Sequence, residues 1–155
     1  MIFSRLLNIK QLRKQKAEKQ LLQDKNQVAK QQQQLNIAEQ QLQEHYHHHK
    51  TREQQFFQTH QQAAISPAQW QNWLAQLQHF QWQKDKLIKD IEIHTDKVNQ
   101  LEKQLIESRK KLNFCLQQTE KFTQLTQQQK CALEQLNEQR EEQEQEEFVR
   151  LSIGK

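Results

Sequence analysis

The chain contains almost none of the residues that end helices or form tight turns. Its 155 residues include one glycine, Gly154, and one proline, Pro67. Glycine-rich phosphate-binding loops need several glycines close together, so nucleotide sites of that kind are excluded. Only 34% of the residues are hydrophobic, which is too few for a compact core in a chain of this length. Disordered chains are rich in Pro, Gly and Ser, whereas Gln, Lys, Glu and Leu dominate here and favour helix. The composition predicts long, solvent-exposed helices.

Cysteines and long apolar runs are also scarce. On a single helix the two cysteines, Cys115 and Cys131, would lie roughly 24 Å apart, which is beyond the reach of a disulfide. We therefore expect reduced thiols in a cytosolic protein. The opening residues, MIFSRLLNIK, hold too short an apolar run for a secretory signal, and no later run is long enough to span a membrane. The protein is expected to stay inside the cell, with no direct membrane insertion.

The sequence shows no set of residues suited to catalysis or to binding a cofactor. No nucleophile has a base and an orienting group in a recognisable pattern, so we expect neither enzymatic activity nor a cofactor. His45 and His49 are four residues apart and would project from one helix face as a chelating pair. No cysteine or carboxylate cluster at ligand spacing accompanies them. We favour a solvated Gln- and His-rich helix surface, with these two histidines near the helix contact, over a metal site.

Hydrophobic residues recur every seven positions in both halves of the chain. One stripe begins at Leu7 and continues to Phe56, although several of its neighbouring positions are polar. The second half is more regular, because two series that start at Trp70 and Trp73 continue beyond residue 130. A seven-residue repeat of this length is typical of helices that wind around a partner helix with a left-handed twist.

Residues 65–70, ISPAQW, carry several helix-start signals at once. Ser66 is a good N-cap, Pro67 suits the first helical position, and Gln69 is placed to complete a capping box with Ser66. Ile65 and Trp70 have the spacing of a hydrophobic staple. Pro67 also disfavours a helical conformation at Ser66. We therefore predict that one helix ends near residue 63 and that another begins at Pro67.

These signals predict an all-α fold, a long two-helix antiparallel coiled-coil hairpin in which the second helix is longer. The antiparallel register would place Phe56 near Trp73 and Leu7 near Phe122, so apolar residues meet along the pair. We expect one domain and a monomer about 120 Å long. The predicted segments are helix 4–63, turn 64–66, helix 67–147 and a flexible tail 148–155.

The formal net charge of +4 is unevenly distributed. Residues 1–30 are strongly basic, whereas residues 134–147 are rich in Glu and Gln. A basic arm raises the possibility of nucleic-acid binding. However, Gly-Arg repeats, a basic-region motif and interleaved aromatic residues are all missing from the sequence, so we favour a solvated basic helix face and no nucleic-acid partner. Residues after about 126 have no helix opposite them, so they either fray or are covered by another protein.

Large apolar residues outside the seven-residue stripes include Trp82, Leu74 and Phe57. Trp82 is predicted to face away from the partner helix, and Leu74 and Phe57 also lie off the contact. One interpretation is that these side chains fold over the aliphatic stems of their neighbours. The other is a patch that docks on another protein, because exposed tryptophans are enriched in binding hot spots. A further alternative for the whole chain is a cytosolic coiled-coil scaffold or homodimer in which the hairpin opens and two chains pair.

Several segments of the chain resemble a known family. The opening IFSRLLNIKQLRKQKAEKQL, the central ISPAQWQNW, the segment LNFCLQQTEKF and the ending EEQEQEEFVR are similar to those of the YscO/SctO family, the central-stalk proteins of type III secretion systems. The flagellar relative FliJ is similar in length, in the tryptophan after the turn and in an acidic stretch that ends in Glu-Phe, so a flagellar stalk is the alternative within this resemblance. The resemblance covers essentially the full chain.

The resemblance implies a function and partners. Members of the family are two-helix coiled coils similar to the stalk subunit of rotary ATPases. They insert into the pore of the hexameric secretion ATPase, connect it to the export gate protein at the cytoplasmic face of the inner membrane, and bind secretion chaperones. By this resemblance the hairpin tip would contact the export gate through Trp70, Trp73, Leu74, Phe80 and Trp82. The opposite end would contact the ATPase through Arg5, Arg13, Lys14, Lys16, Glu141, Glu142, Glu146, Glu147 and Phe148.

Overall fold

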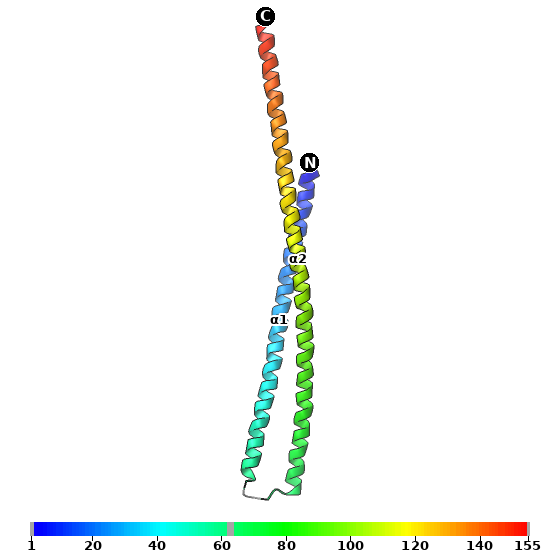
Figure 1. The fold of residues 1–155 in the computed structure, drawn as a ribbon, viewed down its shortest axis with the longest axis vertical. Coiled ribbons are helices and arrows are strands. Elements are labelled where there is room, and N and C mark those ends of the chain that lie inside the picture. Colours follow the sequence, from blue (N-terminus) through cyan, green and yellow to red (C-terminus); the bar gives the residue numbers. More distant parts are fainter. Residues whose placement is uncertain (1, 62–63, 155) are drawn as a thin grey trace. The chain divides into compact units, whose positions relative to one another are not determined.

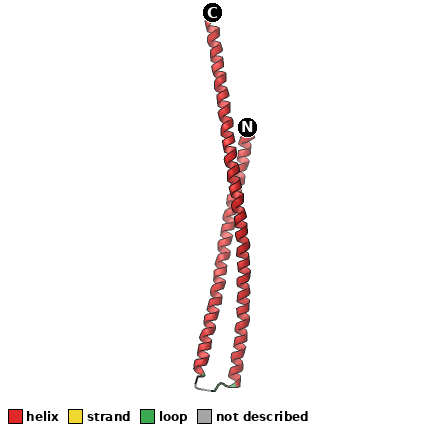
Figure 2. Cartoon of the chain, viewed as in Figure 1, coloured by secondary structure: helices red, strands yellow, loops and turns green. Residues whose placement is uncertain are grey.

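The computed structural model describes residues 2–61 and 64–154, which form two helices. They are α1 (Ile2–Thr59) and α2 (Pro67–Ile153), joined by a short connection (Figure 1). The described residues include no strand (Figure 2). The second helix is longer, with 87 residues against 58 in the first. The predicted all-α antiparallel hairpin with a longer second helix is therefore confirmed.

The capping box predicted at the start of α2 is present. The backbone N–H of Ser66 donates to Gln69 Oε1 at 3.1 Å, and the backbone N–H of Gln69 donates to Ser66 Oγ at 3.2 Å. Trp70 N–H donates to Ser66 O at 3.0 Å and closes the first helical turn. These bonds satisfy backbone donors that have no partner within the helix, and they place the helix start at Pro67 as predicted.

The first helix ends earlier than expected, at Thr59 rather than near residue 63. Residues 62–63 lie outside the described residues. His60 completes the end of α1, because its backbone N–H and its ring Nδ1 both donate to Phe56 O, at 3.3 and 2.7 Å. A histidine side chain can therefore satisfy a terminal carbonyl in place of the glycine that usually ends a helix.

The second helix continues to Ile153, six residues past the expected end at 147. Residues 148–153, which were expected to begin a flexible tail, include no glycine or proline that would stop the helix. Gly154 N–H still donates to Arg150 O at 2.9 Å. Lys155 lies outside the described residues.

Contacts within the chain group its residues into two compact units, each with residues of both helices, and the expectation of a single domain stays a prediction. One unit comprises Gln23–Ile106 and contains the connection between the helices. Its buried apolar residues are Leu35, Ala38, Trp73, Phe80 and Val98. Leu35 and Ala38 are three residues apart on α1, and Trp73 and Phe80 are seven residues apart on α2, so each pair lies on one face of its helix.

The other unit comprises Met1–Leu22 together with Glu107–Lys155. In this unit Thr119 Oγ1 donates to Cys115 O at 2.8 Å and lies 3.4 Å from Lys10 O of α1, and Lys10 Nζ lies 5.4 Å from the centre of the Phe122 ring. The two contacts with Lys10 fix which part of α2 lies beside the start of α1. Every described residue of α2 from Cys131 onward is exposed.

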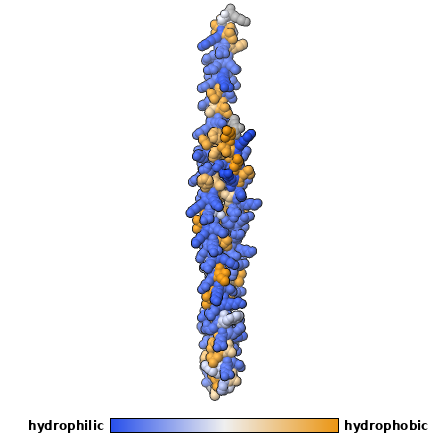
Figure 3. All heavy atoms as spheres, turned by 90° about the vertical axis from the view of Figure 1, so that its right-hand side faces the viewer, coloured by the Kyte–Doolittle hydropathy of each residue, from blue (hydrophilic) through white to orange (hydrophobic). Residues whose placement is uncertain are grey.

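The surface is mainly polar. Figure 3 shows hydrophilic side chains over most of the visible face, with apolar side chains in separate patches. The thiols of Cys115 and Cys131 are free, one half-buried and the other exposed. No described helix has a stretch long and apolar enough to cross a bilayer.

Candidate functional site

A stack of five rings joins α1 and α2 within the unit 23–106. In order, the rings belong to Phe56, Trp73, His49, Phe80 and His45, so that they alternate between the two helices. Successive ring centroids are 4.6, 5.9, 3.7 and 4.6 Å apart, and the interplanar angles between neighbours are 17° or less. We call these five residues the ring stack. The predicted proximity of Phe56 and Trp73 is confirmed by their contact within it.

The ring stack explains the histidine-rich segment. His45 Nε2 donates to Phe80 O at 3.3 Å, and both His45 and His49 are half-buried. His47 and His48, on the other faces of the same turns, are exposed. The two histidines predicted to lie near the helix contact therefore pack against aromatic rings of α2. Among the residues the structure describes, no group of three or more His, Cys, Asp or Glu residues is arranged to hold a metal ion.

The five residues expected at the tip fall into two classes. Trp73 and Phe80 are 5% and 8% exposed and face α1 in the ring stack. Trp70, Leu74 and Trp82 are exposed to 44%, 41% and 61%. The last three side chains are therefore exposed, whereas the first two pack against α1.

Trp82 lies between two cationic or aromatic neighbours on α2. The His79 ring stacks beside it with centroids 6.3 Å apart, and Lys86 Nζ lies 5.5 Å from the centre of its ring. These two contacts leave the indole 61% exposed. Trp82 therefore packs beside a lysine and remains exposed, and its docking on another protein stays a prediction.

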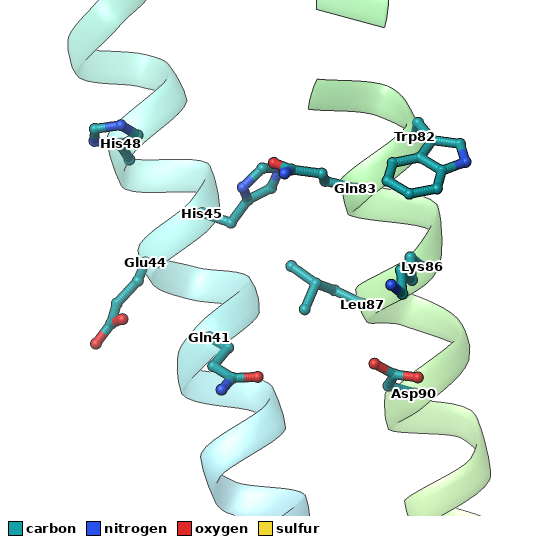
Figure 4. A pocket seen from close by; sticks show the side chains of 9 residues that line it. All are labelled: Gln41, Glu44, His45, His48, Trp82, Gln83, Lys86, Leu87 and Asp90. Carbon is teal, nitrogen blue, oxygen red and sulfur yellow. The ribbon is translucent and has the colours of Figure 1, made fainter. Parts of the chain in front are cut away.

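An open groove with a volume of about 550 Å³ runs beside Trp82 (Figure 4). In Figure 4 the side chains of His45 and Leu87 project between the helices, whereas Glu44 and Trp82 project from their outer sides. The groove is open to solvent, and apart from Leu87 and Trp82 its lining consists of charged, amide and histidine side chains. Its lining residues are Gln41, Glu44, His45, His48, Trp82, Gln83, Lys86, Leu87 and Asp90.

The four basic residues expected to contact an ATPase lie near the start of α1. Arg5, Arg13 and Lys16 are exposed, while Lys14 is half-buried and lies 4.0 Å from Glu18 Oε1. Since Lys10 contacts α2 at Thr119, this basic segment lies beside that part of α2. Most of its basic side chains are exposed to solvent.

The acidic residues expected to contact the ATPase lie further along α2 in the same unit. Glu141, Glu142, Glu146 and Glu147 are all exposed, and Phe148 is 73% exposed. The structure therefore gives one unit two separate charged surfaces, a basic one on α1 and an acidic one on the part of α2 that no other helix covers.

Sequence analysis did not single out two further exposed apolar residues, Leu12 and Phe114, which are 65% and 59% exposed. Both belong to the unit that contains the chain ends. Phe114 follows Leu112 by two residues, and this spacing takes it off the helix contact. Trp82 was identified because it falls outside the seven-residue stripes, and the same criterion would have identified Phe114.

Comparisons with known proteins identify the family. No curated protein and no solved structure matches the chain significantly. By contrast, the sequence model of the family described as type III secretion protein YscO matches residues 3–151. This match covers nearly all of α1 and α2. The chain belongs to the YscO family of type III secretion proteins.

Proposed function

We propose that this protein is the non-enzymatic central stalk of a type III secretion export apparatus. It inserts into the pore of the hexameric secretion ATPase and couples that ring to the export gate, at the cytoplasmic face of the inner membrane. The observation that carries the proposal is a long charged stretch of α2 without a covering helix, in a chain of the YscO family. A helical end of this kind fits a ring pore that supplies the missing contacts.

The proposed mechanism follows from a mismatch of symmetry. A single hairpin has no six-fold symmetry, so it meets the six subunits of a ring in different ways. Contacts that differ between subunits favour closure of one subunit on ATP over the others, and they thereby raise the rate of hydrolysis. The stalk needs no catalytic group of its own for this effect.

Charge supports the assignment of the ring-facing end. Arg5, Arg13 and Lys16 are exposed on α1, and Lys14 lies beside them. The acidic group on α2 presents the opposite sign. A basic and an acidic surface at one end of the stalk favour a single orientation within a ring. Only in that orientation does each surface face a patch of opposite charge on the ring. The acidic group consists of Glu141, Glu142, Glu146 and Glu147, next to Phe148.

The tip is proposed to contact the export gate. Trp70, Leu74 and Trp82 supply the exposed apolar surface, and the groove beside Trp82 extends it. Trp73 and Phe80 contribute by holding α1 and α2 in register beneath that surface. Secretion chaperones are further proposed partners of the hairpin.

Stimulation of the secretion ATPase tests the proposed stalk function. The purified full chain is expected to co-purify with the ATPase and to raise its hydrolysis rate. The charge-reversed variant Arg5→Glu, Arg13→Glu, Lys14→Glu and Lys16→Glu is expected to lose most of this stimulation while its helix content stays unchanged.

A matched control carries the same change in net charge elsewhere on the chain. Lys89, Lys97, Lys103 and Lys110 are exposed on the middle of α2, and their reversal to Glu is expected to leave stimulation intact. If both quadruple variants stimulate as the wild type does, the ring-facing assignment of the basic segment is wrong. If the wild type neither binds nor stimulates the ATPase, the stalk proposal itself is wrong.

A further inference from the structure

The end of α2 carries a stripe of six residues that nothing in the described chain covers. We call residues 131–153 the uncovered segment, because each of them is exposed. The steps along the stripe are three, four, four, four and three residues, so all six positions share one helix face. Leu136 is 51% exposed, and Phe148 and Leu151 are each 73% exposed. The stripe consists of Leu133, Leu136, Arg140, Glu144, Phe148 and Leu151.

This stripe continues the face by which α2 contacts α1. Leu133 and Leu136 follow Thr119 and Phe122 by fourteen residues, or two heptads. Thr119 and Phe122 contact Lys10 of α1. Because α1 begins eight residues before Lys10, its first turn lies opposite about residues 127–130 of α2. The contact face of α2 therefore extends past the start of α1.

We propose that a second copy of this chain covers the uncovered segment in an antiparallel arrangement. The spacing of the stripe residues is the same when the helix is read in either direction. In a reversed copy, the residues opposite one another are also chemically complementary. Reversal places Leu133 opposite the partner's Leu151 and Leu136 opposite the partner's Phe148. It also places Arg140 opposite the partner's Glu144, and two-fold symmetry repeats each of these pairs. A second copy fits the stripe because apolar residues meet at both ends and opposite charges meet at the centre.

The available length matches this arrangement. In the same register the partner's Ile153 lies opposite Cys131, next to the point where α1 begins. The partner's helix therefore ends where α1 starts, and neither hairpin has to open. This geometry differs from a homodimer in which each hairpin unfolds and the two chains pair along their whole length.

Net charge makes the association reversible and dependent on salt. The uncovered segment carries seven glutamates against Arg140 and Arg150, so the two copies repel each other at long range. Screening weakens repulsion between exposed charges, and it leaves the apolar contacts in place. Association is therefore expected to tighten as salt rises. The glutamates are Glu134, Glu138, Glu141, Glu142, Glu144, Glu146 and Glu147.

The uncovered segment is also proposed to enter the ATPase ring. Pairing of two copies would therefore keep this segment covered until the ring binds it. Only this consequence rests on the proposed stalk function. The pairing itself depends on the chain alone, and the experiments below contain no ATPase. Their failure is therefore distinguishable from a failure of the stalk proposal.

Disulfide cross-linking tests the antiparallel register. Two full-length proteins are made in a background with Cys115→Ser and Cys131→Ser, one with Leu133→Cys and the other with Leu151→Cys. An equimolar mixture is expected to form a disulfide between the two different chains on mild oxidation, whereas each protein alone stays largely unlinked. Efficient linkage of the Leu133→Cys protein to itself would indicate a parallel pair, and the absence of any linkage would indicate a monomer. Either result overturns the proposal.

Sedimentation equilibrium with the otherwise unaltered chain tests the charge pair. Arg140→Glu is expected to weaken association at least about tenfold, because it replaces two attractive contacts with two repulsive ones. Adding Glu144→Arg to it is expected to restore association. The control Lys121→Glu makes the same charge change at an exposed position outside the stripe and is expected to have little effect. Raising salt from about 0.02 M to about 0.5 M is expected to tighten wild-type association. A wild type that stays monomeric at all salt concentrations, or an Arg140→Glu effect no larger than that of the control, would overturn the proposal.

Discussion

The ring of His49 on α1 lies against the ring of Phe80 on α2, with centroids 3.7 Å apart and planes inclined by 17°. The contact is near the centre of the ring stack, and Trp73 lies on the other side of His49 at 5.9 Å. Flat rings that alternate between two helices permit few relative shifts of those helices. The stack therefore sets the register of α1 and α2 beneath the exposed surface formed by Trp70, Leu74 and Trp82.

Phe80→Ala is expected to lower the free energy of unfolding by about 2–4 kcal/mol, because it removes a ring that is 8% exposed and contacts two histidines. Urea denaturation followed by circular dichroism measures the change. Trp82→Ala is the matched control, since this larger ring is 61% exposed and its loss is expected to cost under about 0.5 kcal/mol. Equal losses in both variants would contradict a structural role for the stack.

Ser66→Ala is expected to destabilise the hairpin by about 1 kcal/mol, because it removes the side-chain acceptor for Gln69 N–H. Gln69→Ala removes the reciprocal bond to Ser66 N–H. Since the two bonds form one capping box, the double variant is expected to lose less than the sum of the single losses. Thermal unfolding of all four proteins tests this coupling, and strictly additive losses would show that the two bonds act independently.

His94→Leu is expected to stabilise the protein by about 1–2 kcal/mol. Among the described residues His94 Nδ1 is buried without a hydrogen-bond partner, and a buried polar atom without a partner carries a desolvation cost that leucine avoids. His47→Leu is the control, because His47 is exposed and a similar change there is expected to be nearly neutral. The midpoints of urea denaturation of the two variants and of the wild type measure these changes in stability. A destabilised His94→Leu protein would mean that this nitrogen binds an ordered water or another group.

Trp82→Ala combined with Leu74→Ala is expected to weaken binding to the export gate protein at least about tenfold. The free energy of unfolding is expected to change by less than about 1 kcal/mol, because both side chains are exposed. Binding is measured by titration with the purified cytoplasmic part of the gate. Phe114→Ala is the control for a general loss of apolar surface, since Phe114 is 59% exposed and lies in the other unit. Unchanged gate binding by the double variant would exclude the tip as the contact.

The two-helix fold was predictable because the signals for it are local or periodic. Helices depend on residues within a few positions of one another, and the chain has a single interior site where a proline follows a good N-cap. The seven-residue repeat then indicates which face of each helix is covered. For these reasons the start of α2, the hairpin and the greater length of α2 were predicted correctly.

The ends of the helices were less predictable. α1 stops at Thr59 because the side chain and backbone of His60 bind Phe56 O, and sequence patterns rarely identify a histidine that ends a helix. α2 runs to Ile153 because nothing before Gly154 interrupts it. The expected end at residue 147 is the last residue of the acidic segment, yet charge alone does not stop a helix.

Local and periodic signals in the sequence were enough to predict the two helices, the position of the turn between them and the charge at each end of the chain. Which aromatic residues remain exposed depends instead on how the two helices pack. Trp70 and Trp73 are three residues apart in the same repeat, yet one is 44% exposed and the other 5% exposed. The difference arises because Trp73 fits between rings of α1 while Trp70 lies at the first turn of α2. The burial of a side chain depends on which residues of the opposite helix lie beside it. A periodic pattern within one helix does not show which residues those are.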